Sequence, residues 1–130
     1  MYQSSEVDID EILLTFEAYS KNKNEKIDLV KGAKEVRTFT KLGISLKDAK
    51  DFAIEQFLRC SSKNYYRGPN FDRDRCSEKQ RNIWEFGFEV SVEDVTYEIY
   101  VKLKKRDDKG DFVFLSFHIA EYEIVYPFRN

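Results

Sequence analysis

Hydrophobic and polar residues alternate along three segments of the second half of the chain, Ile83 to Val90, Tyr97 to Lys104 and Phe112 to Ile119. Successive residues of a β-strand point to opposite faces, so alternate residues of each segment share a face. The connections 91–96 and 106–111 are short enough for an antiparallel meander. The apolar face of this predicted sheet consists of Trp84, Phe86, Phe88, Val90, Ile99, Val101, Leu103, Val113, Leu115, Phe117 and Ile119.

The opposite face of the same strands collects residues that can exchange protons or carry charge. It consists of Glu85, Tyr100, Lys102, Ser116 and His118. An acid, a phenol, a cation and an imidazole on neighbouring strands could move protons around a phosphate. The plainer interpretation is that an antiparallel sheet with one solvated face carries such side chains in any case.

Apolar residues at helical spacing predict a helical first half. Asp8 to Ser20 reads as an amphipathic helix with acidic residues in its first turn, where they suit the helix dipole. A second helix is expected from Lys31 to Leu42, ending at Gly43, because glycine adopts the left-handed conformation found just past helix ends. Ser45 then offers an N-cap for a third helix, Leu46 to Leu58, with both terminal leucines buried.

The remaining segments are less regular. Residues 27–30 predict either a short strand or the start of the next element, and 59–82 predicts a long, charged, exposed loop. Phe112 and Phe114 make their strand apolar on both faces, which favours a central position or cover by the N-terminal elements. Residues 121–130 form a tail, in which Pro127 argues against a paired position. The expected fold is α+β, one domain with N-terminal helices packed on one face of a C-terminal antiparallel β-sheet.

Composition supports a single domain and limits the expected location of the protein and the expected state of its cysteines. The 130 residues are 42% hydrophobic, enough for a compact core. No segment approaches the roughly 20 apolar residues that cross a bilayer, and the N-terminus is acidic where a signal peptide is basic, so we expect a cytoplasmic protein without membrane contact. With a single histidine, Cys60 and Cys76 cannot build a usual structural zinc site, and we expect two reduced thiols.

The charge distribution is uneven. The net charge of −2 argues against a dedicated nucleic-acid binder, yet residues 59–84 carry seven basic and three acidic side chains, a local excess of four. Arg73 and Arg75 are candidates there for binding a phosphate chain. The alternative is a solvated loop in which these arginines pair with Asp72 and Asp74.

Ordered landmarks between Phe39 and Phe128 resemble a known family. They are KLGIS-LKDAK, YYRGPNFDRDR, IWEFGFEV, YEIYVKLK, FLSFHIAE and YPF. Together they resemble the MqsR family of bacterial toxins from type II toxin-antitoxin modules, over roughly the last two thirds of the chain. The resemblance implies a RelE/ParE-like fold. It also implies an endoribonuclease, an mRNA interferase that needs no metal or other cofactor and that attacks a phosphodiester with the neighbouring 2′-hydroxyl of the RNA.

The positions that match functional positions of that family are Arg67, Glu85, Tyr100 and His118, with Lys102 beside them. In-line attack needs a base, an acid and cations around the phosphate. We expect Glu85 to be the base and His118 the acid, because histidine titrates nearest neutrality. Arg67 and Lys102 would hold the phosphate, and Tyr100 would orient the 2′-hydroxyl or stack on a base.

Two functional hypotheses therefore remain. The first is the toxin nuclease, with mRNA as substrate, a cognate antitoxin as partner and the ribosome as a further potential partner. The second is a non-catalytic module that binds protein or nucleic acid on the same fold. The acidic net charge favours the second hypothesis, as do the replaced residues, since the best-known family members have Lys and Gln at some of these positions.

Overall fold

Five strands form one mostly antiparallel sheet in the computed structural model, which describes residues 3–75 and 79–129. The spatial order is β1-β5-β4-β3-β2, and only β1 and β5 run parallel. The strands are β1 (Ile27–Leu29), β2 (Tyr65–Asn70), β3 (Ile83–Val92), β4 (Val95–Arg106) and β5 (Asp111–Ile119). The helices are α1 (Glu6–Ser20), α2 (Lys23–Lys26), α3 (Ala33–Leu42), α4 (Ala49–Leu58) and the 3-10 turn η1 (Ser62–Asn64). The predicted α+β class, with helices before an antiparallel sheet, is confirmed.

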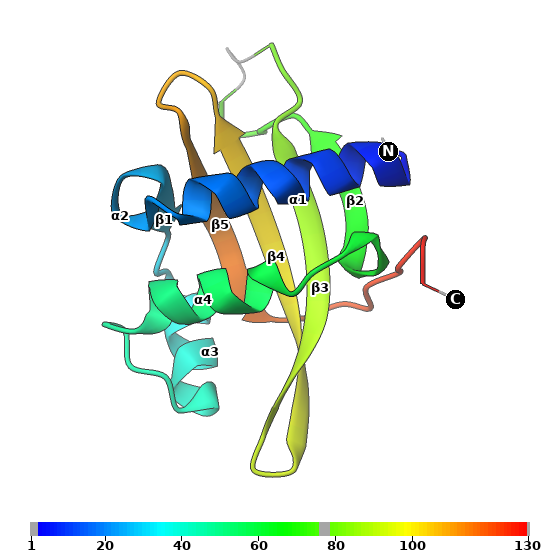
Figure 1. Cartoon of the computed structure of the whole chain (residues 1–130). Coiled ribbons are helices and arrows are strands. Elements are labelled where there is room, and N and C mark those ends of the chain that lie inside the picture. Colours follow the sequence, from blue (N-terminus) through cyan, green and yellow to red (C-terminus); the bar gives the residue numbers. More distant parts are fainter. Residues whose placement is uncertain (1–2, 76–78, 130) are drawn as a thin grey trace.

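Helices α1 and α4 cross one face of the sheet (Figure 1). Phe16 of α1 contacts Phe57 of α4, with ring centroids 4.6 Å apart, and Phe57 contacts Phe86 of β3 at 5.0 Å. Edge-to-face pairs of this kind stabilise a core beyond the apolar area they bury. Phe112 and Phe114 also contact Phe16, so the expected cover of β5 by the N-terminal elements is confirmed.

The central hairpin β3–β4 is regular. Its turn consists of Glu93 and Asp94, both at positive φ, as in the tight two-residue turns whose twist suits a hairpin. Every residue from Ile83 to Val92 has a partner on β4, with no interruption of the register. Alternation in the sequence therefore predicts the face of each side chain here correctly.

The ends of the helices follow the sequence signals in part. Gly43 ends α3 in the left-handed conformation, at φ 73°, as predicted. Helix α4 begins only at Ala49, because the preceding residues form a turn in which the Ser45 hydroxyl accepts the backbone N–H of Asp48. The predicted burial of Leu46 and Leu58 is wrong, since each is 43% exposed.

Two short strands lie where the sequence was ambiguous or misleading. Residues 27–30 contain β1, one of the two structures expected there. The segment predicted as an exposed loop contains η1 and the edge strand β2, in which Tyr65 is fully buried. Gly68 and Pro69 interrupt the strand pattern of β2, which is why alternation alone missed it.

The C-terminal tail crosses the sheet on the face opposite α1 and α4 (Figure 1). Ile124 and Tyr126 lie so close to Gly87 of β3 that a Cβ there would fall 2.5 Å from the Tyr126 hydroxyl. Tyr126 also donates a hydrogen bond to Glu98 at 2.9 Å, and Phe128 packs against Tyr65. As predicted, the tail forms no strand among the described residues. It covers the part of the polar face around Gly87.

Within residues 3–75 and 79–129, no helix combines the length and apolarity needed to cross a membrane.

Candidate active site

Polar side chains from four strands form a row on the face opposite α1 and α4. Arg67 of β2 is in register with Glu85 of β3, which is in register with Lys102 of β4. Lys102 is in register with Ser116 of β5. Directly opposed residues of neighbouring antiparallel strands have side chains on the same face. The row therefore brings together three of the residues that sequence reasoning selected, Arg67, Glu85 and Lys102.

A second row lies two residues along β4, about 7 Å from the first. It contains Tyr100 and His118, which are in register, with ring centroids 5.3 Å apart. Gly87 completes the row on β3 and is covered by the tail. The two rows place the five predicted site residues on one surface, as the alternation indicated.

A bulge in β2 puts Arg67 on this face. Tyr65 opposes Phe86 and Arg67 opposes Glu85, so Tyr66 is the extra residue in the register. Without the bulge, Tyr65 and Arg67 would share a face. With it, Tyr65 enters the core while Arg67 reaches the polar row.

A second bulge, in β5, does the same for His118. The register runs from Phe114 opposite Leu103 to Ser116 opposite Lys102, which skips Leu115. The bulge allows Phe112 and Phe114 to face the helices while Ser116 and His118 face away from them. It also corrects one prediction: Val113 lies on the polar face beside Lys104, not in the core set.

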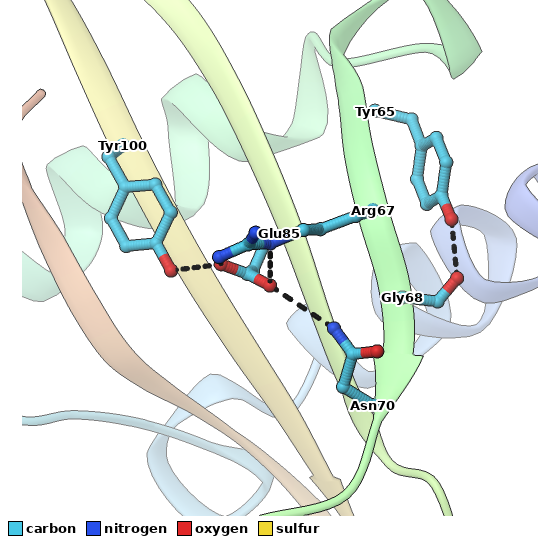
Figure 2. A network of polar contacts seen from close by, with 6 residues as sticks. All are labelled: Tyr65, Arg67, Gly68, Asn70, Glu85 and Tyr100. Carbon is cyan, nitrogen blue, oxygen red and sulfur yellow. Dashed lines mark hydrogen bonds and ion pairs between the residues drawn. The ribbon is translucent and has the colours of Figure 1, made fainter. Parts of the chain in front are cut away.

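Glu85 is the hub of a buried network (Figure 2). Arg67 donates through Nε at 2.7 Å and Nη2 at 3.0 Å, Asn70 donates at 3.3 Å, and the Tyr100 hydroxyl donates to Oε1. We expected Glu85 on a solvated surface, yet the residue is 3% exposed. Four donors fill the roughly four lone-pair positions of a carboxylate. This carboxylate therefore has a structural role: it fixes the positions of the side chains that donate to it.

The network changes the ionisation of two of its members. The hydrogen bond to Glu85 raises the pKa of Arg67. Burial raises the pKa of the Tyr100 phenol well above its ordinary value, and the Glu85 carboxylate that accepts its hydrogen bond raises the pKa further. Tyr100 is consequently a permanent hydrogen-bond donor near neutral pH, and Arg67 a permanent cation stacked over the ring of Tyr66 at 4.5 Å.

A cleft of about 290 Å³ opens over the two rows and is bounded by the tail. Arg67, Tyr100, Lys102, Ser116 and His118 line it. Lys102 is half-buried and forms no hydrogen bond or ion pair within residues 3–75 and 79–129. The cleft therefore holds an ammonium group that no side chain of the described residues pairs with, beside the carboxylates of Glu121 and Glu123 in the same lining.

His118 enters this cleft with one nitrogen already engaged. Nδ1 lies 2.9 Å from the backbone oxygen of Ile119. A carbonyl oxygen can only accept, so Nδ1 carries the proton, and in the neutral ring the lone pair lies on Nε2. The arrangement gives His118 a defined tautomer with a free basic nitrogen.

Two side chains of α3 hold the backbone on either side of His118. Glu35 accepts the N–H of Phe117 at 3.2 Å, and Thr38 accepts the N–H of Ile119 at 2.9 Å. Both are buried polar residues on the apolar side of α3. Sequence reasoning missed them, although polar residues within an apolar helical stripe were the available signal. They fix the position of His118 without contacting the cleft.

The other expected substrate-binding residues lie elsewhere. Arg73 and Arg75 are exposed and do not line the cleft, and neither forms an ion pair in the part of the chain that the structure describes. The alternative predicted pairs between these arginines and Asp72, but among the described residues Asp72 forms no ion pair with either, although the charge of Arg75 helps to lower the pKa of Asp72. It instead binds Lys104, with Nζ and Oδ2 2.8 Å apart.

Cys60 does not line the cleft. Burial raises the pKa of Cys60 to about 12, so the group stays a thiol. Cys76 lies outside the described residues. Among those residues, no group of three or more His, Cys, Asp or Glu side chains is arranged to hold a metal ion.

Comparisons with protein-family models, with curated proteins and with solved structures found no match to this chain.

Proposed function

We propose that the protein is an endoribonuclease that cleaves RNA by attack of a 2′-hydroxyl on the adjacent phosphate. One observation carries the proposal: the free Nε2 of His118 and the unpaired ammonium of Lys102 lie in neighbouring rows of one cleft, beside the guanidinium of Arg67. A basic nitrogen next to two cations is what abstraction of a hydroxyl proton beside a phosphate requires.

The geometry suggests roles that differ from those expected. Glu85 and His118 are both buried, at 3% and 8% exposed, but the lone pairs of the Glu85 carboxylate are all taken whereas His118 lines the cleft, so His118 replaces Glu85 as the base. In this mechanism Nε2 takes the proton of the 2′-hydroxyl, a bond forms between the 2′-oxygen and phosphorus, and the bond from phosphorus to the 5′-oxygen breaks. The 5′-oxygen takes a proton from a water molecule in the cleft, and the hydroxide left behind takes the proton back from Nε2, which restores the neutral imidazole. The products are a 2′,3′-cyclic phosphate and a free 5′-hydroxyl.

The cations neutralise the charge that develops on the phosphate. Arg67 has five N–H groups, and those not bonded to Glu85 remain available for phosphate oxygens. Glu85 binds the Nε and Nη2 edge of the Arg67 guanidinium, and the Tyr66 ring stacks on the guanidinium face. Lys102 supplies the second positive charge from the centre of the row.

The test is cleavage of a long single-stranded RNA in buffer containing a chelator, with and without ribosomes. We expect fragments ending in 2′,3′-cyclic phosphate, identified by mass spectrometry, and no cleavage of the same sequence as DNA, which lacks the attacking group. His118→Asn retains an N–H near Nδ1 and loses Nε2, so the rate should fall about 10²- to 10⁴-fold. RNA that stays intact in every condition would overturn the proposal.

A non-catalytic binding module is the second candidate, and the saturation of Glu85 favours it, because the carboxylate expected to do chemistry is used for structure. The resemblance to MqsR-family toxins adds that expression should arrest growth and that a cognate antitoxin should relieve the arrest. If His118→Asn arrests growth as strongly as the unaltered protein, binding without cleavage becomes the better account.

A further inference from the structure

A second hollow, of about 220 Å³, adjoins the cleft on the side of α3. Lys34, His118, Ala120 and Glu121 line both. The two hollows therefore share a wall. A linear polymer bound in the cleft beside His118 could continue into the second hollow.

The second hollow is basic. Lys34, Arg37 and Lys41 of α3 follow one another at spacings of three and four residues, which places them on one face of the helix. All three are exposed. Lys34 binds Glu121 at 2.6 Å, whereas Arg37 and Lys41 form no hydrogen bond or ion pair within residues 3–75 and 79–129. Three cations against the one acidic residue lining this hollow leave two positive charges unbalanced.

The hollow is also held rigidly relative to His118. Glu35 and Thr38 bind the backbone on both sides of His118 and lie on the same helix as the three cations. A group bound by Arg37 and Lys41 would consequently sit at a fixed distance from the cleft.

We propose that this basic hollow binds a phosphate of the nucleotide next to the scissile one, so that single-stranded RNA runs from the cleft over the end of β5 and along α3. The inference rests on the proposed nuclease function and extends it. The substrate is a strand with a further phosphate beside the cleaved bond, and Arg37 and Lys41 bind that phosphate. Arginine and lysine without protein partners are the side chains that phosphate backbones engage.

The experiment measures binding without cleavage. A labelled 12-nucleotide, mixed-sequence RNA with 2′-O-methyl groups throughout cannot be cut by the proposed mechanism, and its affinity is followed by fluorescence anisotropy over a range of salt concentrations. Each phosphate contact to a single strand contributes about 0.7 to the slope of log affinity against log salt. Because Arg37 and Lys41 would bind one phosphate, the double variant Arg37→Ala, Lys41→Ala should lower the slope by about 0.7 and the affinity at least tenfold.

A matched control removes two positive charges elsewhere. Lys21 and Lys109 are exposed, line neither hollow and have no ion pair in the described chain. Lys21→Ala, Lys109→Ala should leave the slope close to that of the unaltered protein. Equal slopes for both double variants would overturn the inference, and so would binding of a polyglutamate peptide as tight as that of RNA, which would indicate an acidic protein partner.

The outcomes separate the two proposals. If the unaltered protein cuts ordinary RNA while the two double variants bind the methylated RNA alike, the nuclease stands and the second phosphate site fails. If no RNA is cut, but the salt dependence of binding decreases only in the variant Arg37→Ala, Lys41→Ala, the phosphate site is supported and the nuclease proposal fails.

Discussion

Lys102 and Lys104 lie two residues apart on β4 and on the same face of the sheet, yet their surroundings differ. Lys104 is 5% exposed and binds Asp72 at 2.8 Å. Lys102 is half-buried, lines the cleft and has no partner within residues 3–75 and 79–129. The first charge is neutralised inside the protein, whereas the second is available to a ligand.

The difference shows that a buried ion pair does not by itself indicate a functional site. A pair that is satisfied internally fixes structure, here by tying the segment after β2 to β4. A cation held in place without a counter-ion is what a phosphate-binding site needs. Replacing each lysine by methionine, which has a similar length and no charge, tests this separation directly.

The largest effect is expected from Lys102→Met on cleavage. Loss of one group that stabilises developing charge typically lowers kcat about 10²- to 10³-fold. Stability should change by no more than about 0.5 kcal/mol, because no hydrogen bond or ion pair among the described residues is lost. Single-turnover cleavage and urea denaturation measure the two quantities. A rate unchanged within a factor of three would remove Lys102 from the proposed site.

The opposite result is expected for Lys104→Met. Asp72 would remain largely buried without its cation, and breaking such a pair costs about 3 kcal/mol at the lower end of the observed range. The free energy of unfolding should fall by that amount in urea denaturation, while kcat for cleavage stays within about threefold. If the two methionine variants lose activity equally, the division between a structural and a functional lysine is wrong.

The regular hairpin and the bulged strands differ in what the sequence could predict. In β3 and β4 the register is uninterrupted, so alternation assigned Glu85, Tyr100 and Lys102 to the correct face. In β5 alternation predicted the correct face for Ser116 and His118 and the wrong face for Val113, because the bulge at Leu115 changes the face partway along the strand. Bulges leave no fixed signature in the alternation of polar and apolar residues.

The burial of a polar side chain and its bonding partners were harder to predict from the sequence than the face of the sheet on which it lies. Alternation placed Glu85 opposite the core but could not show that β2 would cover it, because β2 was read as loop. The contacts of Glu35 and Thr38 join residues about 80 positions apart. Their place within an apolar helical stripe indicates that each needs a buried partner, but no local pattern identifies that partner. For the same reason, the Asp72–Lys104 pair was not foreseen.

Tyr100→Phe removes one hydrogen-bond donor from the Glu85 network, so its effect on stability can be compared with that of Lys102→Met, which removes none. Removing one donor to a charged acceptor costs about 1.5 kcal/mol, and Glu85 keeps its bonds to Arg67 and Asn70. Because the folded-state pKa of Tyr100 is raised, the protonated phenol stabilises the fold fully below the ordinary value of about 10 and progressively less as the pH rises above it. Urea denaturation between pH 8 and about 11 should therefore show a decline for the unaltered protein that is smaller in the variant. Parallel declines would mean that Tyr100 is not the group responsible.

The smallest expected effect is on the pH dependence of stability and comes from replacing Asp72. Burial acts to raise its pKa, but the hydrogen bonds from Lys104 and from the Asp74 backbone outweigh burial and leave the pKa below its ordinary value. A lowered folded-state pKa means that this stabilisation is present above about pH 4 and is lost as the pH falls towards the folded-state value. In Asp72→Asn, stability should decrease less steeply below pH 4 than in the unaltered protein, as measured by urea denaturation at several acid pH values. The corresponding slope for Lys102→Met should match the unaltered protein, because Lys102 has no carboxylate partner to titrate; a change there would mean that both lysines share in the acid stability of the fold.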